Sequence, residues 1–184
     1  MRALHFLILQ AGLLTNGTTL ASKTWSISNF RAKGSGCQQE QVKVVKRDEN
    51  RLDISINPFK VQGRPIRKNC VVILDIDHQS GWSFAIEKFK TAYNVKTGED
   101  TKNKLTTYSY FQGNKEQTRF VRNWKGTKNT VEEIDENSKK LIYSPCQGRR
   151  SININTAIFS RGKSTEIELS SPLTYLLKWK PCKH

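Results

Sequence analysis

The chain has 184 residues and carries 31 Lys and Arg against 16 Asp and Glu, a formal net charge of +15 at pH 7. This length is one domain's worth of chain and is long enough to bury a hydrophobic core. Beyond the N-terminal segment no apolar run approaches the roughly 20 residues that cross a bilayer, so we expect no membrane span.

The N-terminus has the pattern of a secretory signal. Arg2 precedes an apolar core, Ala3–Leu14, and small residues, Thr19 and Ala21, occupy the −3 and −1 positions of a cleavage site. A buried N-terminal helix is the alternative interpretation. We favour a signal peptide over residues 1–21, cleaved before Ser22.

We expect residues 22–184 to form a single secreted domain in the extracellular space. Loss of Arg2 with the signal lowers the net charge from +15 to +14. Export exposes the chain to an oxidising compartment, so its four cysteines are candidates for disulfides. Because their number is even, all four can pair and no free thiol need remain.

The mature sequence alternates apolar and polar residues with the period of two that is typical of strands. Polar turn sequences separate these segments. The pattern predicts an all-β protein, an antiparallel β-sandwich of two sheets. Its alternating apolar sets are Leu52, Ile54, Ile56; Trp82, Phe84, Ile86; Ile152, Ile154; Ile167, Leu169; and Leu173, Tyr175, Leu177, Trp179.

The segment KNTVEEIDENSKKLIY, residues 128–143, is the one place where a helix competes with a strand. Its apolar residues Val131, Ile134 and Leu141 fit neither period well. We interpret it as a polar loop or one short helical turn.

Four cysteines allow three pairings, and the expected strand layout favours one of them. A hairpin of segments 151–159 and 166–179 brings Cys146 and Cys182 together at its open end. An up-down-up set of strands, 41–46, 51–57 and 71–76, brings Cys37 and Cys70 to one end of the domain. We therefore favour Cys37–Cys70 and Cys146–Cys182.

Six short sequences, spread in order from Cys37 to Cys182, resemble a known family. The family comprises small secreted proteins of fungi, with bacterial relatives, catalogued as a domain of unknown function, number 4360. The matching sequences are GCQQ (36–39), RLDISINPF (51–59), RKNC followed by VVILDIDHQSGW (67–82), TYSYFQG (107–113), YSPCQGRRSININTAIF (143–159) and LKWKPC (177–182). The resemblance implies an exported β-rich module, often counted among candidate effectors of host-living fungi, with no established activity.

The stretch IRKNCVVILDIDHQSGW, residues 66–82, contains the most polar cluster at a strand end. Asp75 and Asp77 point to one face of a strand and His78 to the other, so the three do not converge. We expect a hydrated strand exit, with Asp77 or His78 capping the turn into Gly81. The spacing lacks the acidic ligands of a calcium loop, and we predict no metal and no cofactor.

Catalytic patterns are weak in this chain. The mature sequence holds two histidines, His78 and His184, and no serine in a Gly-x-Ser-x-Gly elbow. The best enzymatic alternative is a secreted ribonuclease with His78 and Glu87 as acid and base and an arginine on the phosphate.

The excess positive charge favours anionic partners, although much of it serves solubility. A possible polyanion-binding pattern interleaves Arg119, Phe120, Arg122, Trp124 and Lys125, which could stack on bases or sugars while neutralising their charges. In the alternative, Phe120 and Trp124 belong to the core. The pair Arg149 and Arg150 adds a second basic patch.

The leading hypothesis is a basic, disulfide-stapled binding protein without catalytic activity, a candidate fungal effector. Its partner would be a macromolecule of the host or cell surface, and acidic polysaccharide or nucleic acid would fit the charge. The alternatives are a ribonuclease-like or RNA-binding protein that uses His78 and the basic patches, and a lectin-like binder.

Overall fold

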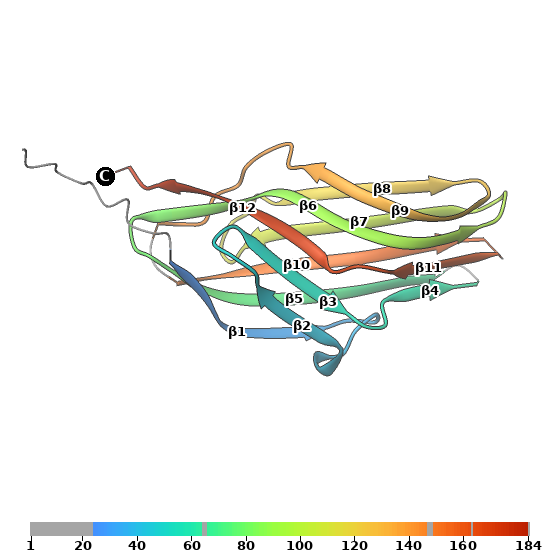
Figure 1. Ribbon diagram of the computed structural model, residues 1–184, viewed down its shortest axis with the longest axis horizontal. Helices are drawn as coiled ribbons and strands as arrows, with labels where there is room; N and C mark the ends of the chain where they lie inside the picture. The colour runs from blue at the N-terminus through green and yellow to red at the C-terminus, as the bar shows by residue number, and fades with distance from the viewer. Residues whose placement is uncertain (1–23, 64–65, 147–148, 163, 184) are drawn as a thin grey trace, which may run out of the picture.

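The structure, a computed structural model, describes residues 24–63, 66–146, 149–162 and 164–183 (Figure 1). The expected signal peptide, residues 1–21, and His184 lie outside the described residues. Two antiparallel sheets make up almost all of the described chain, whose only helical segment is a short 3-10 turn, Gln39–Gln41. The prediction of an antiparallel β-sandwich is confirmed.

The first sheet has five strands, all antiparallel to their neighbours, which run along the long axis of the molecule (Figure 1). Their order across the sheet is β1 (Trp25–Lys33), β5 (Ile66–His78), β10 (Arg149–Arg161), β7 (Lys102–Phe111) and β8 (Thr118–Lys125).

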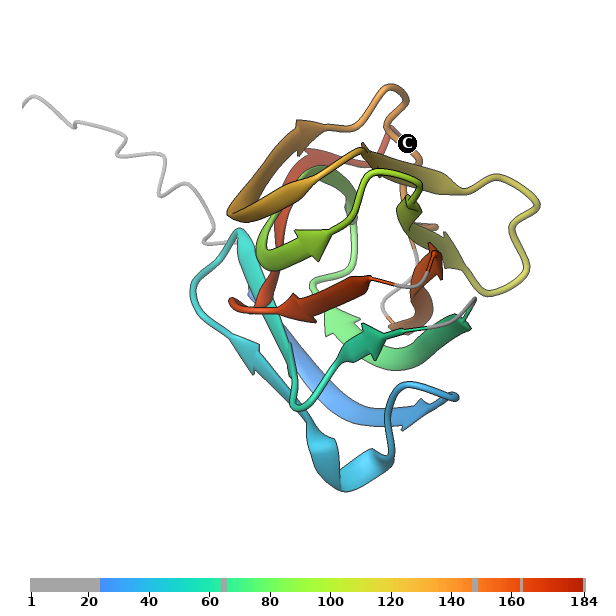
Figure 2. The same cartoon turned by 90° about the vertical axis from the view of Figure 1, so that its right-hand side faces the viewer.

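The second sheet has seven strands and is built around the long strand β6 (Trp82–Thr97). Figure 2 views the strands end-on. The order across the sheet is β2 (Val42–Lys46), β3 (Arg51–Ile56), β12 (Leu173–Pro181), β6, β11 (Thr165–Leu169) and β4 (Lys60–Gln62), and β9 (Lys128–Asn137) pairs with the other side of β6.

The core lies between the sheets and is filled by the inward side chains of the predicted alternating sets. Leu52, Ile54 and Ile56 on β3 are buried, as are the corresponding residues of β10 and β12. Aromatic rings fill the centre, with Phe84 and Trp179 5.0 Å apart between centroids. Burial of this apolar surface is the main stabilising contribution to the fold.

Two strand partnerships differ from the prediction. Segments 151–159 and 166–179 do not form a hairpin, because β10 belongs to the five-stranded sheet and β11 and β12 to the seven-stranded one. The expected set 41–46, 51–57 and 71–76 is also divided, because β2 pairs with β3 while β5 lies in the opposite sheet. Alternation identifies the inward face of a strand, but it does not say which sheet the strand joins.

The segment 128–143, interpreted as a loop or helical turn, begins with a strand. Residues 128–137 form β9, whose whole length pairs with residues 88–97 of β6. Only Ile134 of this strand is fully buried, and Val131 is 56% exposed. The weak alternation therefore reflects an outer strand held by its backbone ladder and not by a core-facing row of side chains.

Both favoured disulfides are present, but they staple different parts of the fold. Cys37–Cys70 joins the loop after β1 to β5, so it closes a pairing within the five-stranded sheet. Cys146–Cys182 joins the segment before β10 to the end of β12, so it links the two sheets at one end. The pairing was predicted correctly, although the strand layout used to derive it was wrong.

A buried carboxylate, Asp53 on β3, organises the outer side of the seven-stranded sheet. Its side chain is 3% exposed and accepts hydrogen bonds from Arg47 Nε at 2.9 Å, Arg51 Nε at 3.0 Å and Thr174 Oγ1 at 2.8 Å. Burial raises the pKa of Asp53, but the hydrogen bonds from Arg51, Thr174 and Arg47 outweigh burial and hold that pKa below its ordinary value.

We expect Asp53→Asn to lower the free energy of unfolding by about 1 to 3 kcal/mol at neutral pH, because it removes hydrogen bonds to an ionised acceptor. Because the folded pKa lies below the unfolded value of about 3.9, this contribution is complete above that pH and is lost as the pH falls through the folded pKa. Urea unfolding across this range measures the effect. A gap between wild type and variant that stays constant down to acidic pH contradicts it, and Asp135→Asn, on an exposed ion pair, is the control with a nearly unchanged stability.

Candidate functional site

The outward side chains of the five-stranded sheet form a strongly basic surface, which we call the basic face. Along each strand of this sheet, the outward residues alternate with buried ones. Its cations are Arg31 and Lys33 on β1, Arg67 on β5, Lys102 and Lys104 on β7, Arg119 and Lys125 on β8, and Arg149 and Arg161 on β10. Only two carboxylates share these strand positions, Asp75 and Asp77.

The two carboxylates occupy one end of the basic face. Asp75 Oδ1 accepts a hydrogen bond from Ser151, and Asp77 pairs with Arg149 Nε at 2.9 Å. Among the described residues, Arg149 is the only cation of this face in an ion pair. The remaining positive charges are therefore available to an external anion.

Aromatic and amide side chains lie among these cations in two rows across the sheet. Tyr108 stands opposite Asn155, and Tyr110 stands opposite Asn153. Tyr110 is 39% exposed and Phe159 38% exposed. The Arg119 guanidinium lies 5.4 Å from the centre of the Tyr108 ring, so one side of that ring is already covered.

The outer side of the seven-stranded sheet differs, because carboxylates lie among its cations and, within the described ranges, five of these cations form ion pairs. The Asp135 carboxylate on β9 forms ion pairs with the Nζ atoms of both Lys88 and Lys90 of β6, at 2.7 and 3.0 Å. Lys178 pairs with Glu87 at 2.8 Å, and Asp53 holds its two arginines. The two outer faces of the sandwich thus differ in available charge, although both contain many lysines and arginines.

The residues of the interleaved pattern on β8 separate into two groups. Phe120 and Trp124 are buried, where Phe120 stacks on Phe89 at 5.3 Å and Trp124 lies 5.9 Å from Tyr93. Their rings are therefore not available to a ligand at the surface. Arg119 and Lys125 belong to the basic face.

Arg122 lies on the core side of β8 at the edge of the sheet. It reaches across to Glu132 of β9 at 3.5 Å, which connects the two sheets along the edge where β8 and β9 run side by side (Figure 1). From this position, Arg122 links two strands of the protein and does not belong to the basic face.

Arg149 and Arg150 face opposite sides of β10. Arg149 is opposite Asp77 on the basic face, whereas Arg150 is opposite the buried Ile76 and is half-buried. Arg150 Nε is buried and has no hydrogen-bond partner in the described chain. The pair does not form one patch.

His78 is not at a hydrated strand exit. Strand β5 continues to His78, so the alternation turns its ring inward against Phe84 and Trp179, with centroids 5.6 and 5.9 Å away. Nδ1 donates to the carbonyl of Gln79 at 3.1 Å, because a carbonyl only accepts. The turn into Gly81 is closed by the amide of Trp82, which donates to the same carbonyl.

The acid and base of the ribonuclease alternative are not brought together. His78 is in the core, while Glu87 bonds Lys178 on the outer side of the other sheet. No group of three or more His, Cys, Asp or Glu suited to a metal gathers in the described ranges. Within the same ranges, no helix has the length and apolar character needed to cross a membrane.

Sequence reasoning missed most of the basic face. The residues that it missed on this face include Lys104, Tyr108, Tyr110, Asn153, Asn155 and Phe159, and it did not group Arg67 with them. The signal was present in the period of two, because Asn153 and Asn155 alternate with the buried Ile152 and Ile154. What could not be read from one strand was that β5, β7, β8 and β10 are neighbours.

The chain is similar to a curated fungal protein and to carbohydrate-binding modules. An "Uncharacterized secreted protein" of Arthroderma benhamiae is 25% identical over 136 residues, which cover 68% of this chain and 55% of that protein. The chain thus spans about half the length of this relative.

Two solved structures match most of the chain, but with low structural similarity. One is TmCBM61 in complex with β-1,4-galactotriose, with a TM-score of 0.34 and 13% identity, covering 84% of this chain and 90% of that one. The other is a family 11 carbohydrate-binding module from Clostridium thermocellum with a mixed-linked tetrasaccharide, with a TM-score of 0.26 and 10% identity, covering 89% and 90%. At TM-scores this low, neither similarity bears on the ligand of this chain.

A family model covers nearly all of the described chain. It matches residues 23–182, from just before β1 to the second cysteine of the disulfide that joins the sheets. The protein therefore belongs to the family described as Domain of unknown function (DUF4360).

Proposed function

We propose that the protein is a secreted binding protein without catalytic activity that holds an acidic polysaccharide of a host or cell surface on its basic face. The signal-like N-terminus, the two disulfides and the secreted relative support export. A role as an effector would be exercised through this binding.

The observation that carries the proposal is the difference in charge pairing between the two outer faces. On the basic face the cations of all five strands have no acidic partner in the described chain, except Arg149. On the opposite face the ion pairs of Asp53, Glu87 and Asp135 satisfy the lysines and arginines around them. An anionic polymer is therefore attracted to one side of the molecule.

An acidic polysaccharide suits this face better than a nucleic acid. Single-stranded nucleic acid binds by stacking successive bases on aromatic faces. Here Phe120 and Trp124 are in the core and Arg119 covers one side of Tyr108. The exposed Tyr110 and Phe159 stand far apart, because Tyr110 is opposite Asn153, six positions along β10 from Phe159. The amide of Asn153 can both donate and accept hydrogen bonds, which matches sugar hydroxyls beside carboxylates, whereas the Oδ1 atom of Asn155 is buried.

Binding to polygalacturonate, measured against salt concentration, tests the proposal with two triple variants. Arg67→Gln/Lys104→Gln/Arg119→Gln removes three charges from the basic face. Lys43→Gln/Lys96→Gln/Lys139→Gln removes the same charge from elsewhere on the surface. We expect the first to weaken binding roughly tenfold at low salt and to flatten the salt dependence, because each exposed cation contributes up to about 1 kcal/mol. The second should leave affinity within roughly twofold.

Equal weakening by both triple variants would show that net charge, and not the basic face, attracts the polymer. An RNA oligonucleotide is the second ligand in the same assay. Tighter binding of RNA than of polygalacturonate, lost in the first triple variant, would replace the polysaccharide by nucleic acid as the partner. Cleavage of that RNA would overturn the non-catalytic proposal.

A further inference from the structure

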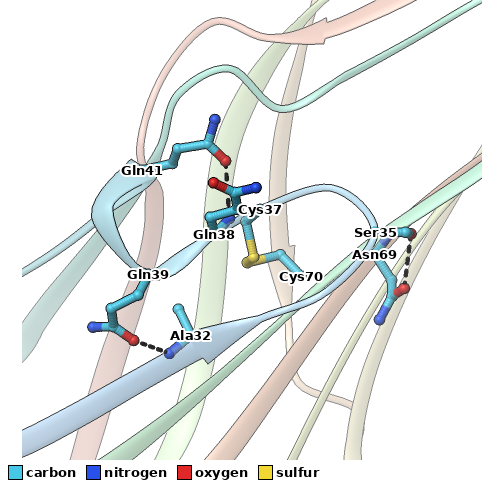
Figure 3. The surroundings of a disulfide bond; sticks show 8 residues. All are labelled: Ala32, Ser35, Cys37, Gln38, Gln39, Gln41, Asn69 and Cys70. Carbon is cyan, nitrogen blue, oxygen red and sulfur yellow. Dashed lines mark hydrogen bonds between the residues drawn. A yellow bond between two sulfur atoms is a disulfide. The ribbon is translucent and has the colours of Figure 1, made fainter.

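A hollow of about 390 Å³ opens beside the Cys37–Cys70 disulfide, away from the basic face. It lies between the loop that follows β1, the short strand β4 and the beginning of β5. Figure 3 shows the disulfide and the loop beside it. Its polar lining comes from Ser35, Gln38, Gln41, Lys60, Gln62 and Lys68. A volume of this size lies within the range of small-ligand sites.

The walls of the hollow are held in place by contacts within the protein. The disulfide is buried, and the amide of Gly36 donates to the carbonyl of Asn69 at 2.9 Å. A Cβ on Gly36 would lie 2.6 Å from the Phe59 ring, so only glycine allows this approach. Ser35 Oγ donates to Asn69 Oδ1 at 3.1 Å (Figure 3). A site fixed in this way loses little conformational entropy when a ligand binds.

The side chains that face the hollow offer mainly hydrogen-bond donors. Gln41 Oε1 accepts from the amide of Gln38 at 2.8 Å, which leaves the Nε2 group of Gln41 pointing away from the loop (Figure 3). Among the described lining residues none is Asp or Glu. Glu168 stands opposite Lys60 in the ladder but forms no ion pair with it.

Lys68 is the most informative of these residues. It occupies an inward position of β5, two residues before the buried Cys70, and it is half-buried. Its ammonium has no ion-pair or hydrogen-bond partner in the described chain. The ammonium itself remains accessible to water, so it can pair with an anion that enters the hollow.

We propose that this hollow binds a sugar acid, with the carboxylate on the Lys68 ammonium and the ring hydroxyls on the amides of Gln38, Gln41 and Gln62. A carboxylate is the negatively charged partner that the Lys68 ammonium lacks. A side-chain amide can both donate hydrogen bonds to hydroxyl groups and accept them. The site is independent of the proposed function, because its residues lie outside the basic face.

Titration of the isotope-labelled mature protein with D-glucuronate, followed by NMR, tests this site. We expect shifts of the Gly36 and Gln38 amides and of the Gln41 side-chain amide, and none with glucose. Lys68→Gln should weaken glucuronate binding roughly tenfold, because a charge-assisted hydrogen bond is lost. Lys68→Arg should retain most of the binding, and unchanged spectra elsewhere show that both variants are folded.

The controls separate this site from the basic face. Lys104→Gln should leave glucuronate binding unchanged, and Lys68→Gln should leave polygalacturonate binding within roughly twofold. Absence of shifts around Gly36 with glucuronate would overturn the proposal. Equal shifts and affinity with inorganic phosphate would also overturn it, because the hollow would then recognise charge without the sugar.

Discussion

Replacement of Trp124 by alanine is expected to lower the free energy of unfolding by about 3 to 5 kcal/mol, a large part of the usual total. The Trp124 side chain is 1% exposed and packs against Tyr93 from the edge strand β8. Its removal leaves a cavity between β8 and β6 that the edge strand can fill only in part. Urea unfolding of wild type and variant measures the loss, and Arg122→Ala on the same strand should be nearly neutral.

The same variant separates a core residue from a ligand-stacking one. If Trp124 packs in the core, the fraction of the variant that remains folded should bind polygalacturonate as tightly as wild type does. A ligand-stacking tryptophan would give the opposite result, a small change in stability with a large loss of affinity. That result would contradict the burial seen in the structure.

The predictable part of the fold was local. Alternation correctly identified Ile152 and Ile154, or Tyr175 and Leu177, as inward residues, because a buried face imposes a period of two whichever strand lies alongside. Alternation does not encode the neighbour itself. The prediction therefore pairs β10 with the segment that follows it in sequence, whereas its backbone pairs with β5 and β7.

The site was predictable only in its charge. A short interleaved run such as residues 119–125 satisfies two interpretations, and only the neighbouring strands decide that Phe120 and Trp124 face Phe89 and Tyr93. The basic face is assembled from strands that are far apart in sequence, such as Arg67 on β5 and Lys104 on β7. Residues of this kind become a surface only when the sheet order is known.

His78 shows the same limit at a single residue. From the residues alone, β5 is expected to end at Asp77, because polar residues commonly end strands. The strand continues because Trp25 of β1 pairs with His78, and the rings of Phe84 and Trp179 cover the imidazole from the opposite sheet. Because β5 is one residue longer than expected, the imidazole of His78 lies in the core and not at the surface.

The two disulfides allow a matched comparison, because they close loops of similar length but lie in different surroundings. The sequence separations are 33 and 36 residues, so each bond restricts the unfolded chain to a similar extent, worth about 4 kcal/mol. Cys37 and Cys70 are buried, whereas Cys146 is exposed and Cys182 is half-buried. Differences between the two bonds therefore arise from the folded state.

We expect Cys37→Ala/Cys70→Ala to lower stability by about 4 to 5 kcal/mol and Cys146→Ala/Cys182→Ala by about 4 kcal/mol, because only the first also removes buried sulfur atoms from the packing. Denaturant unfolding of the two double variants measures both losses. In the wild type, a mild thiol reductant under native conditions should open Cys146–Cys182 first, because its sulfur atoms are more accessible. Alkylation and mass mapping would reveal the order, and earlier labelling of Cys37 and Cys70 would show that the loop beside the hollow opens more readily than its packing indicates.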